Sequence, residues 1–188
     1  MGPAATRRTL DEWLHAHVRV MDDFPKPGVV FQDLSPVYLQ PKLVRGLAES
    51  MISVFRGRFD HVVAIDARGF VLGAVVAHLA QRPLVLLRKP GKLPGPVFSE
   101  HYELEYGAAK LEIQRDALPD GAKAVVVDDV LATGGTLAAA AALVEASNAL
   151  VTGLAVVLEI PELGGRARLH PHPVFAAGRV GETTARTG

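Results

Sequence analysis

Residues 125–136 read Val-Val-Val-Asp-Asp-Val-Leu-Ala-Thr-Gly-Gly-Thr, and this stretch decides the fold that we expect. An apolar run, typical of a buried strand, stops at Asp128 and Asp129. A loop of small residues follows, and the alanine-rich residues 137–146 predict a helix. N–H groups at the start of a helix stabilise an anion, and carboxylates accept hydrogen bonds from hydroxyls. The stretch therefore predicts a binding site for a sugar phosphate.

Strand-like and helix-like segments alternate on both sides of this stretch. We expect helices at 10–21, 41–55, 70–80 and 137–146, buried strands at 61–65, 84–87, 123–127 and 153–160, and a short irregular tail. Continuous apolar strands that alternate with helices are typical of a parallel sheet. The sequence therefore predicts an α/β fold with a mostly parallel central sheet and helices on both faces.

Three loops that carry polar residues each follow a predicted strand, at residues 66–69, 88–101 and 128–136. Loops at the carboxyl ends of parallel strands lie at one edge of the sheet, where ligands bind. The second loop is long and rich in proline and glycine, so we expect it to be mobile, with residues 102–113 extended after it. The three loops are expected to form one site.

Composition excludes several other classes of protein. The 20 basic and 20 acidic residues cancel, which gives no support for nucleic-acid binding, and no cysteine is present for a disulfide or a thiolate. No apolar run approaches the ~20 residues of a membrane span, and no hydrophobic segment follows Arg7 and Arg8 as in a secretory signal. We therefore expect one domain over residues 1–188, in a cytoplasmic protein that binds neither nucleic acid nor membrane.

The sequence also resembles a known family. Residues 128–136 (DDVLATGGT) are similar to the signature of the type I phosphoribosyltransferases. Three further stretches narrow the resemblance to the branch that uses adenine: DFPKPGVVFQD at 23–33, RKPGKLPG at 88–95, and LEYG at 104–107 followed by LEIQRDAL at 111–118. The resemblance runs from about residue 22 to residue 160 and implies transfer of the 5-phosphoribosyl group from phosphoribosyl pyrophosphate to adenine, giving AMP and pyrophosphate.

The resemblance implies an architecture and partners as well. The fold would be that of the type I phosphoribosyltransferases, with residues 1–35 contributing a small hood that binds the base. The protein would work as a homodimer with Mg²⁺, which pyrophosphate, ribose and water would hold without a direct protein ligand. Such hard oxygen ligands are the ones that Mg²⁺ prefers.

The ribose 5-phosphate would be bound by the opening stretch. Asp128 and Asp129 would bind the ribose hydroxyls, and the 5′-phosphate would be bound by Ala132, Thr133, Gly134, Gly135 and Thr136. Glycines let the backbone approach an anion, and the threonine hydroxyls add donors. No lysine follows the glycines, so the loop is not a nucleoside-triphosphate P-loop. An ordinary strand-to-helix turn remains the alternative interpretation.

Two further loops would bind the pyrophosphate. The implied residues are Asp66, Ala67, Arg68, Arg88, Lys89 and Lys92. Guanidinium groups form paired hydrogen bonds with phosphate, and a loop of this kind can close over a ligand. A plain turn and a solvated charged loop are the alternatives. The family commonly has serine at the position of Ala67, and whether Arg88 serves its own site or that of a partner subunit stays open.

The remaining implied residues concern the base and the chemistry. Val30, Phe31, Gln32 and Val130 would bind adenine, although a Val-Val-Phe run is also typical of a core. Glu105 would exchange a proton with N7 of the purine, Arg68 would assist catalysis, and Tyr106 would support loop closure. Relatives often have arginine or lysine at the position of Gln32, and usually serine at that of His101.

Three other features or functions fit parts of the same sequence. The pairs His15/His17 and His170/His172 suggest a metal site, but they lack acidic or thiol partners nearby in sequence, so we expect structural roles. A phosphoribosyltransferase for hypoxanthine, guanine or xanthine would share most of these motifs. A non-catalytic regulator that binds phosphoribosyl pyrophosphate would share the pocket, but such proteins typically add a DNA-binding domain or a basic face.

Overall fold

The computed structural model describes residues 9–104 and 107–180, and within these ranges residues 103, 104, 107 and 108 only by their backbone. The chain divides into two compact units, residues 1–47 and residues 48–188. The first contains α1 (Leu10–His15), β1 (Arg19–Met21), β2 (Phe31–Asp33), α2 (Ser35–Tyr38) and the start of α3 (Pro41–Val54). None of the described helices is long and apolar enough to span a membrane.

The N-terminal helix is shorter than its apolar spacing predicts. A capping box starts α1: Thr9 Oγ1 accepts a hydrogen bond from the backbone N–H of Glu12 (3.2 Å), and the Glu12 carboxylate accepts one from the Thr9 N–H (2.9 Å). The helix ends at His15. The prediction of a helix to residue 21 was wrong there, because β1 pairs antiparallel with β2 instead.

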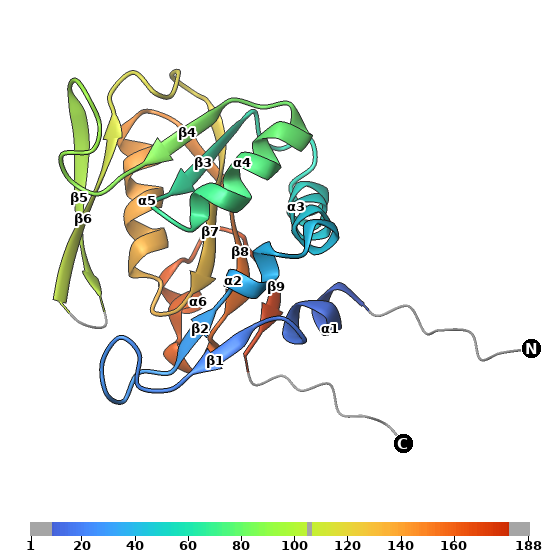
Figure 1. Ribbon diagram of the computed structural model, residues 1–188. Coiled ribbons are helices and arrows are strands. Elements are labelled where there is room, and N and C mark those ends of the chain that lie inside the picture. The colour runs from blue at the N-terminus through green and yellow to red at the C-terminus, as the bar shows by residue number, and fades with distance from the viewer. Residues whose placement is uncertain (1–8, 105–106, 181–188) are drawn as a thin grey trace, which may run out of the picture. The chain divides into compact units, whose positions relative to one another are not determined.

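A five-stranded sheet forms the centre of the second unit. Its order is β4-β3-β7-β8-β9, and every neighbouring pair is parallel. The strands are β3 (His61–Ile65), β4 (Leu84–Leu87), β7 (Lys123–Leu131), β8 (Leu150–Glu159) and β9 (Val174–Arg179). Figure 1 shows them with α4 (Gly69–Ala80) and α5 (Gly135–Ala146). The predicted α/β fold with a mostly parallel sheet is confirmed.

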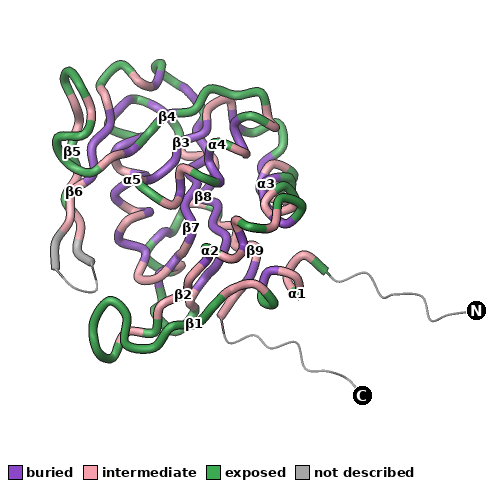
Figure 2. The backbone as a smooth tube through the Cα atoms, viewed as in Figure 1, coloured by how far each residue is buried: buried purple, intermediate pink, exposed green. Residues whose placement is uncertain are grey.

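Helices cover both faces of this sheet, because successive side chains of a strand point to opposite faces. Val63, Val126 and Val156 belong to a buried cluster that includes Leu137 and Leu143 of α5. Ala64, on the alternate face, contacts α4 at Gly73. Figure 2 shows β7, β8 and much of α5 as buried. The core of the second unit therefore lies largely between the sheet and α5.

Several predicted features of the second unit were wrong. The tail is not irregular: η1 (Pro161–Leu163) and α6 (Gly165–Arg168) lead into β9, which pairs with β8. The long loop ends at residue 96, because β5 (Val97–Leu104) begins a hairpin with β6 (Gly107–Gln114) at the next residue. Finally, β4 is an edge strand on which Leu84 and Leu86 are exposed, so it is not buried throughout.

Gly73 lets α4 lie directly on β3. A Cβ built at this position would overlap the Cβ of Ala64, which cannot rotate away. The close approach fixes the height of α4 above the sheet. Because α4 begins at Gly69, this contact also sets the position of the loop that precedes the helix.

We predict that Gly73→Ala lowers the free energy of unfolding by about 1–3 kcal/mol, the usual cost of overpacking a core. Alanine otherwise favours a helix over glycine by roughly 1 kcal/mol, so the overlap with Ala64 must outweigh that gain. Urea denaturation measures the difference. Gly46→Ala in α3 is the control, because its Cβ would meet only the end of the Leu10 side chain at 3.2 Å. A Gly73→Ala protein as stable as the wild type would contradict the prediction.

Candidate functional site

Asp128 and Asp129 lie inside β7, near its carboxyl end. The prediction that the strand stops at these residues was wrong, because three later pairs continue the register with β8: Asp128↔Val156, Val130↔Leu158 and Leu131↔Glu159. Both carboxylates are buried, with exposed fractions of 8% and 6%. The strand therefore places two adjacent acidic side chains in the interior.

Burial and mutual repulsion govern the ionisation of this pair. Burial raises the pKa of Asp128 well above its usual value, and the neighbouring charge of Asp129 raises it further. Burial also raises the pKa of Asp129, although Arg68 opposes the shift, with its Nε 2.5 Å from Asp129 Oδ2. The backbone N–H of Asp129 donates to Asp128 Oδ1 (2.9 Å). Arg68 is thus the cation that favours a charged Asp129.

The loop 66–69 lies directly against β7. A Cβ at Gly69 would stand 2.9 Å from both Asp128 Oδ1 and the carbonyl oxygen of Val127, so only glycine fits without displacement. The Asp66–Ala67 peptide bond is cis. The structure therefore brings the predicted Arg68 beside the predicted carboxylates.

The loop of residues 132–136, called the 132–136 loop below, leads from β7 into α5. Gly134 adopts φ +80°, a left-handed conformation that favours glycine, and caps the helix. The helix begins at Gly135, two residues before the predicted start, and its first hydrogen bond runs from the N–H of Ala138 to the carbonyl of Gly134 (2.9 Å). The N–H groups of the first turn thus belong to residues of the predicted anion site.

Arg88 pairs with Asp66, another residue of the predicted pyrophosphate site. Its Nε lies 3.2 Å from Asp66 Oδ2, and its guanidinium carbon lies 5.9 Å from the centre of the Phe70 ring. Its Nη1 donates to the carbonyl oxygen of Lys92 (3.4 Å). The side chains of Lys89 and Lys92 are exposed. The structure thus joins two of the predicted loops through the ion pair of Arg88 and Asp66.

Glu112 fixes the turn that carries these cations, and sequence reasoning missed it. The N–H of Gly91 donates to Glu112 Oε2 (3.0 Å), and Lys110 Nζ lies 3.2 Å from Oε1. The hydrogen bond from Gly91 holds the pKa of this buried carboxyl below its usual value. Residues 88 and 112 also exchange two backbone hydrogen bonds. A polar residue between Leu111 and Ile113, both buried, was the available signal.

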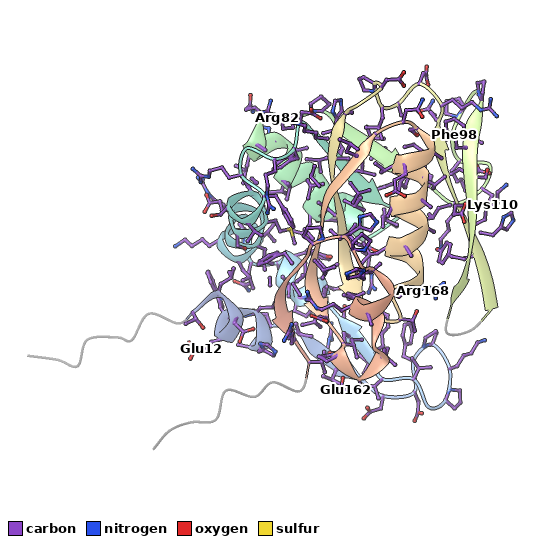
Figure 3. All side chains as sticks on the ribbon, turned by 180° about the vertical axis from the view of Figure 1, so that it is seen from behind. Glu12, Arg82, Phe98, Lys110, Glu162 and Arg168 are labelled. Atoms are coloured by element: carbon purple, nitrogen blue, oxygen red, sulfur yellow. The ribbon has the colours of Figure 1, made fainter. Side chains whose placement is uncertain are left out.

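The hairpin of β5 and β6 lies along α5. Figure 3 labels Phe98 on β5 and Lys110 on β6. Phe98 and Tyr102, four residues apart on β5, both pack on the buried cluster that includes α5. The Tyr102 side chain forms a hydrogen bond with that of Thr136, and burial raises the pKa of the phenol. Tyr102 was not among the predicted site residues, although the period-two spacing with Phe98 indicates a shared face.

The predicted base-binding residues fall in both units. Val30 is exposed, Gln32 is buried, and the ring of Phe31 lies edge-on to Phe24 with 5.0 Å between centroids, all in the first unit. Val130 is half-buried on β7 of the second unit. Glu105 and Tyr106 lie outside the described residues.

His15, His17 and His172 each contact an identified partner. His15 and His17 each place Nδ1 within 2.9 Å of a backbone carbonyl four residues earlier, and His172 Nε2 lies 3.6 Å from Glu145 Oε1. Among the residues that the structure describes, no three His, Asp or Glu side chains come together as a metal site.

Comparison with known proteins gives a consistent set of relatives. The phosphoribosyl transferase domain family matches residues 37–175. A protein of Arthrobacter sp. named adenine phosphoribosyltransferase is 43% identical over 174 residues, which cover 92% of this chain and 94% of the relative.

Solved structures agree with the sequence relatives. A crystal structure of adenine phosphoribosyltransferase from Thermoanaerobacter pseudethanolicus has a TM-score of 0.87 and 40% identity, covering 91% of this chain and 99% of that one. The enzyme of that name from Saccharomyces cerevisiae has a TM-score of 0.83 and 35% identity, covering 89% and 97%. That structure is a complex with adenine and D-2,5-dideoxy-2,5-imino-altritol 1,6-bisphosphate.

The buried carboxylates generate a test on the ligand-free protein. Asp128→Asn is expected to raise the free energy of unfolding at pH 8 by about 0.5–2 kcal/mol, the usual range for one stabilising substitution. Folding raises the pKa of Asp128, so the protonated side chain favours the native state at low pH. This contribution is lost as the pH rises from the pKa of the unfolded chain towards the higher pKa of the folded protein. The gain should therefore shrink as the pH falls.

Chemical denaturation at several pH values measures this difference. Asp116→Asn, which removes a charge from an exposed position, is the matched control. An Asp128→Asn protein that is no more stable than the wild type at pH 8 would contradict the expectation.

Proposed function

Since this chain belongs to the phosphoribosyl transferase domain family and, within it, to the adenine phosphoribosyltransferases, we propose that it makes AMP from adenine and phosphoribosyl pyrophosphate, releasing pyrophosphate. The observation that carries the proposal is the placement of two buried carboxylates at the end of β7, one short loop before a glycine-capped helix start. This arrangement offers acceptors for ribose hydroxyls beside N–H donors for a phosphate.

We propose that the donor's ribose 5-phosphate is bound by this stretch. Asp128 and Asp129 accept hydrogen bonds from the ribose hydroxyls, and the 132–136 loop binds the 5′-phosphate. Gly134 supports this role because its left-handed conformation turns the backbone into α5. The dipole of a twelve-residue helix favours the phosphate at this end.

The pyrophosphate is bound by the two neighbouring loops in this proposal. Asp66, Ala67 and Arg68 form one side, with backbone donors and one guanidinium. Arg88, Lys89 and Lys92 supply cations on the other side, and the ion pair of Arg88 with Asp66 supports their proximity. A charged leaving group of this kind needs several fixed cations.

The chemistry follows from the bond that breaks. The bond between the anomeric carbon and pyrophosphate lengthens and leaves oxocarbenium-like charge on the ribose, which carboxylates beside it stabilise. Adenine N9 then forms the new bond. As N9 forms this bond the base loses its N7 proton, which the Glu105 carboxylate accepts, and general acid–base help of this kind contributes roughly 10²–10⁴ in rate. Closure by Tyr106, together with the hairpin beside α5, keeps water from the reacting carbon.

Adenine recognition is proposed for residues of the first unit. Phe31 contacts a face of the ring in this proposal, while backbone groups of Val30 and Gln32 bind its polar edge. We propose that residues 1–35 form the hood over the base in a single functional domain. The exposed Val30 and the aromatic pair of Phe24 and Phe31 support an apolar contact surface in this segment.

Mg²⁺ is proposed as the cofactor. The donor set supports indirect binding, because Asp66 and Asp129 are already paired with arginines and the described residues hold no cluster of three ligands. Pyrophosphate, ribose and water would then supply its oxygen ligands. When bound, the ion would neutralise charge on the leaving group. Asp128 and Asp129 would hold the ribose hydroxyls, and Arg68 would contact the pyrophosphate.

We also propose a cytoplasmic homodimer. The lack of cysteine is consistent with a reducing compartment. Three apolar side chains of the second unit that are exposed in the single chain, Val71, Leu84 and Leu86, support a contact between subunits.

The reaction is tested by incubating the protein with phosphoribosyl pyrophosphate, Mg²⁺ and equal amounts of adenine, hypoxanthine, guanine and xanthine. We expect AMP as the main product, and loss of turnover when the metal is chelated. A 6-oxo base presents an acceptor where adenine presents a donor, and an unsatisfied buried group costs about 1–3 kcal/mol. If the protein preferred hypoxanthine, the assignment of adenine as substrate would be wrong. If it bound phosphoribosyl pyrophosphate without forming a nucleotide, a non-catalytic regulator would be favoured.

Glu105→Gln tests the proton transfer. The glutamine keeps the shape of the side chain but cannot exchange a proton, so kcat should fall by roughly 10²-fold or more while the KM for phosphoribosyl pyrophosphate changes little. Steady-state kinetics with each substrate varied in turn measures both constants. Glu103→Gln, two residues earlier in the chain, is the matched control. Equal effects on kcat and KM, or no effect, would remove Glu105 from this role.

A further inference from the structure

A buried carboxylate stands beside the 132–136 loop without belonging to any predicted role. Glu159 is the last residue of β8 and has an exposed fraction of 4%. It is the register partner of Leu131, the residue that immediately precedes the loop. The N–H of Ile160 donates to the carbonyl of Leu131 (2.9 Å), so the backbone at Glu159 is joined to the start of the loop.

Two guanidinium groups hold this carboxylate. Arg166 forms a fork, with Nε donating to Glu159 Oε1 (2.8 Å) and Nη2 donating to Oε2. Arg179 Nε donates to Oε2 (3.1 Å). The hydrogen bonds from Arg166 hold the pKa of Glu159 below its usual value, so the carboxylate stays charged at neutral pH. Arg166 Nη1 also donates to the carbonyl of Val174 (2.8 Å), which ties it to β9.

The residue before Arg166 touches the 132–136 loop. A Cβ built on Gly165 would overlap the carbonyl oxygen of Ala132 and would stand 2.7 Å from the backbone N of Gly134. Measured from the loop, a Cβ built on Gly134 would stand 2.6 Å from the carbonyl oxygen of Gly165. Two backbones therefore contact each other with no side chain between them, one in the loop and the other at the start of α6.

We propose that Glu159 and Arg166 are positioning residues for the 5′-phosphate site: their ion pair holds Gly165 against the backbone of residues 132–134 and so sets the N–H groups that receive the phosphate. The inference rests on the proposed function only for the identity of the anion, a sugar 5-phosphate. A shift of the donors away from the phosphate weakens binding steeply, because hydrogen bonds depend on distance and angle.

A competing explanation makes an opposite prediction. Two arginines and one glutamate leave a net positive charge, which could attract the phosphate through its field alone. Removing the negative charge of Glu159 would then strengthen phosphate binding. If the ion pair acts by position, the same change weakens binding, because the fork of Arg166 loses its charged partner. Glu159→Gln therefore separates the two explanations by the sign of its effect.

The experiment measures binding of ribose 5-phosphate by calorimetry and the kinetic constants of AMP formation. For Glu159→Gln and Arg166→Met we expect the dissociation constant of ribose 5-phosphate and the KM of phosphoribosyl pyrophosphate to rise roughly 10- to 100-fold, as for a small misplacement of binding groups. The KM for adenine should stay within about threefold, since a factor of that size is under 1 kcal/mol. Arg168→Met removes the same charge from an exposed position of α6 and is the matched control.

A pair of glycine variants tests the contact without changing any charge. Gly165→Ala pushes a methyl group into the backbone of the 132–136 loop and should weaken ribose 5-phosphate binding. Gly164→Ala, where φ is +65° and nothing lies within 4 Å of a Cβ, strains only its own backbone. It should lower the melting temperature while leaving the dissociation constant unchanged.

The outcomes are distinguishable. Unchanged or tighter ribose 5-phosphate binding in Glu159→Gln overturns the inference, as does a Gly165→Ala protein that binds like the wild type. Both binding results can be interpreted whether or not the wild-type protein forms AMP. A wild type that binds ribose 5-phosphate but forms no AMP overturns the proposed reaction and leaves the inference supported by the variants.

Discussion

The burial of two adjacent carboxylates at the end of β7 is the constraint on which the rest of the second unit depends. Charges removed from water are costly unless cations and hydrogen bonds compensate them. Arg68 compensates Asp129 directly, whereas burial keeps the pKa of Asp128 raised. The site is therefore less stable without a ligand than an apolar strand would be. Ribose hydroxyls would donate hydrogen bonds to these oxygens, so binding and the relief of this cost would coincide.

The elements around the carboxylates are placed by backbone contact rather than by large side chains. Gly69 brings the start of α4 against β7, Gly73 brings the helix against β3, and Gly165 brings the start of α6 against the 132–136 loop. A side chain at any of these positions would move a backbone segment that lines or supports the site. Short-range contact of this kind leaves little room for adjustment. It therefore fixes the N–H groups and carboxylates relative to one another before a ligand arrives.

Sequence reasoning predicted the elements whose pattern is local and long. The strand His61–Ile65 and the helix Pro41–Val54 were found because apolar periodicity continues over several residues. β1 and β9 were missed because such short strands are fixed by pairing with partners elsewhere in the chain. The ion pairs of Arg68 and Arg88 could not be predicted from the residues alone, although the loops that carry them were. The roles assigned to the site residues remain predictions.

Glu159 shows why supporting residues escape this kind of reasoning. Its partners lie 7 and 20 residues further along the chain, and no motif joins them. What unites them is the sheet: β8 carries Glu159 between the last residues of β7 and β9, while α6 folds Arg166 back onto it. From the sequence alone, a glutamate at the end of a strand is predicted to be an ordinary exposed residue. Only the register shows that it is buried beside Leu131, where a change in its position would be transmitted directly to the loop that follows.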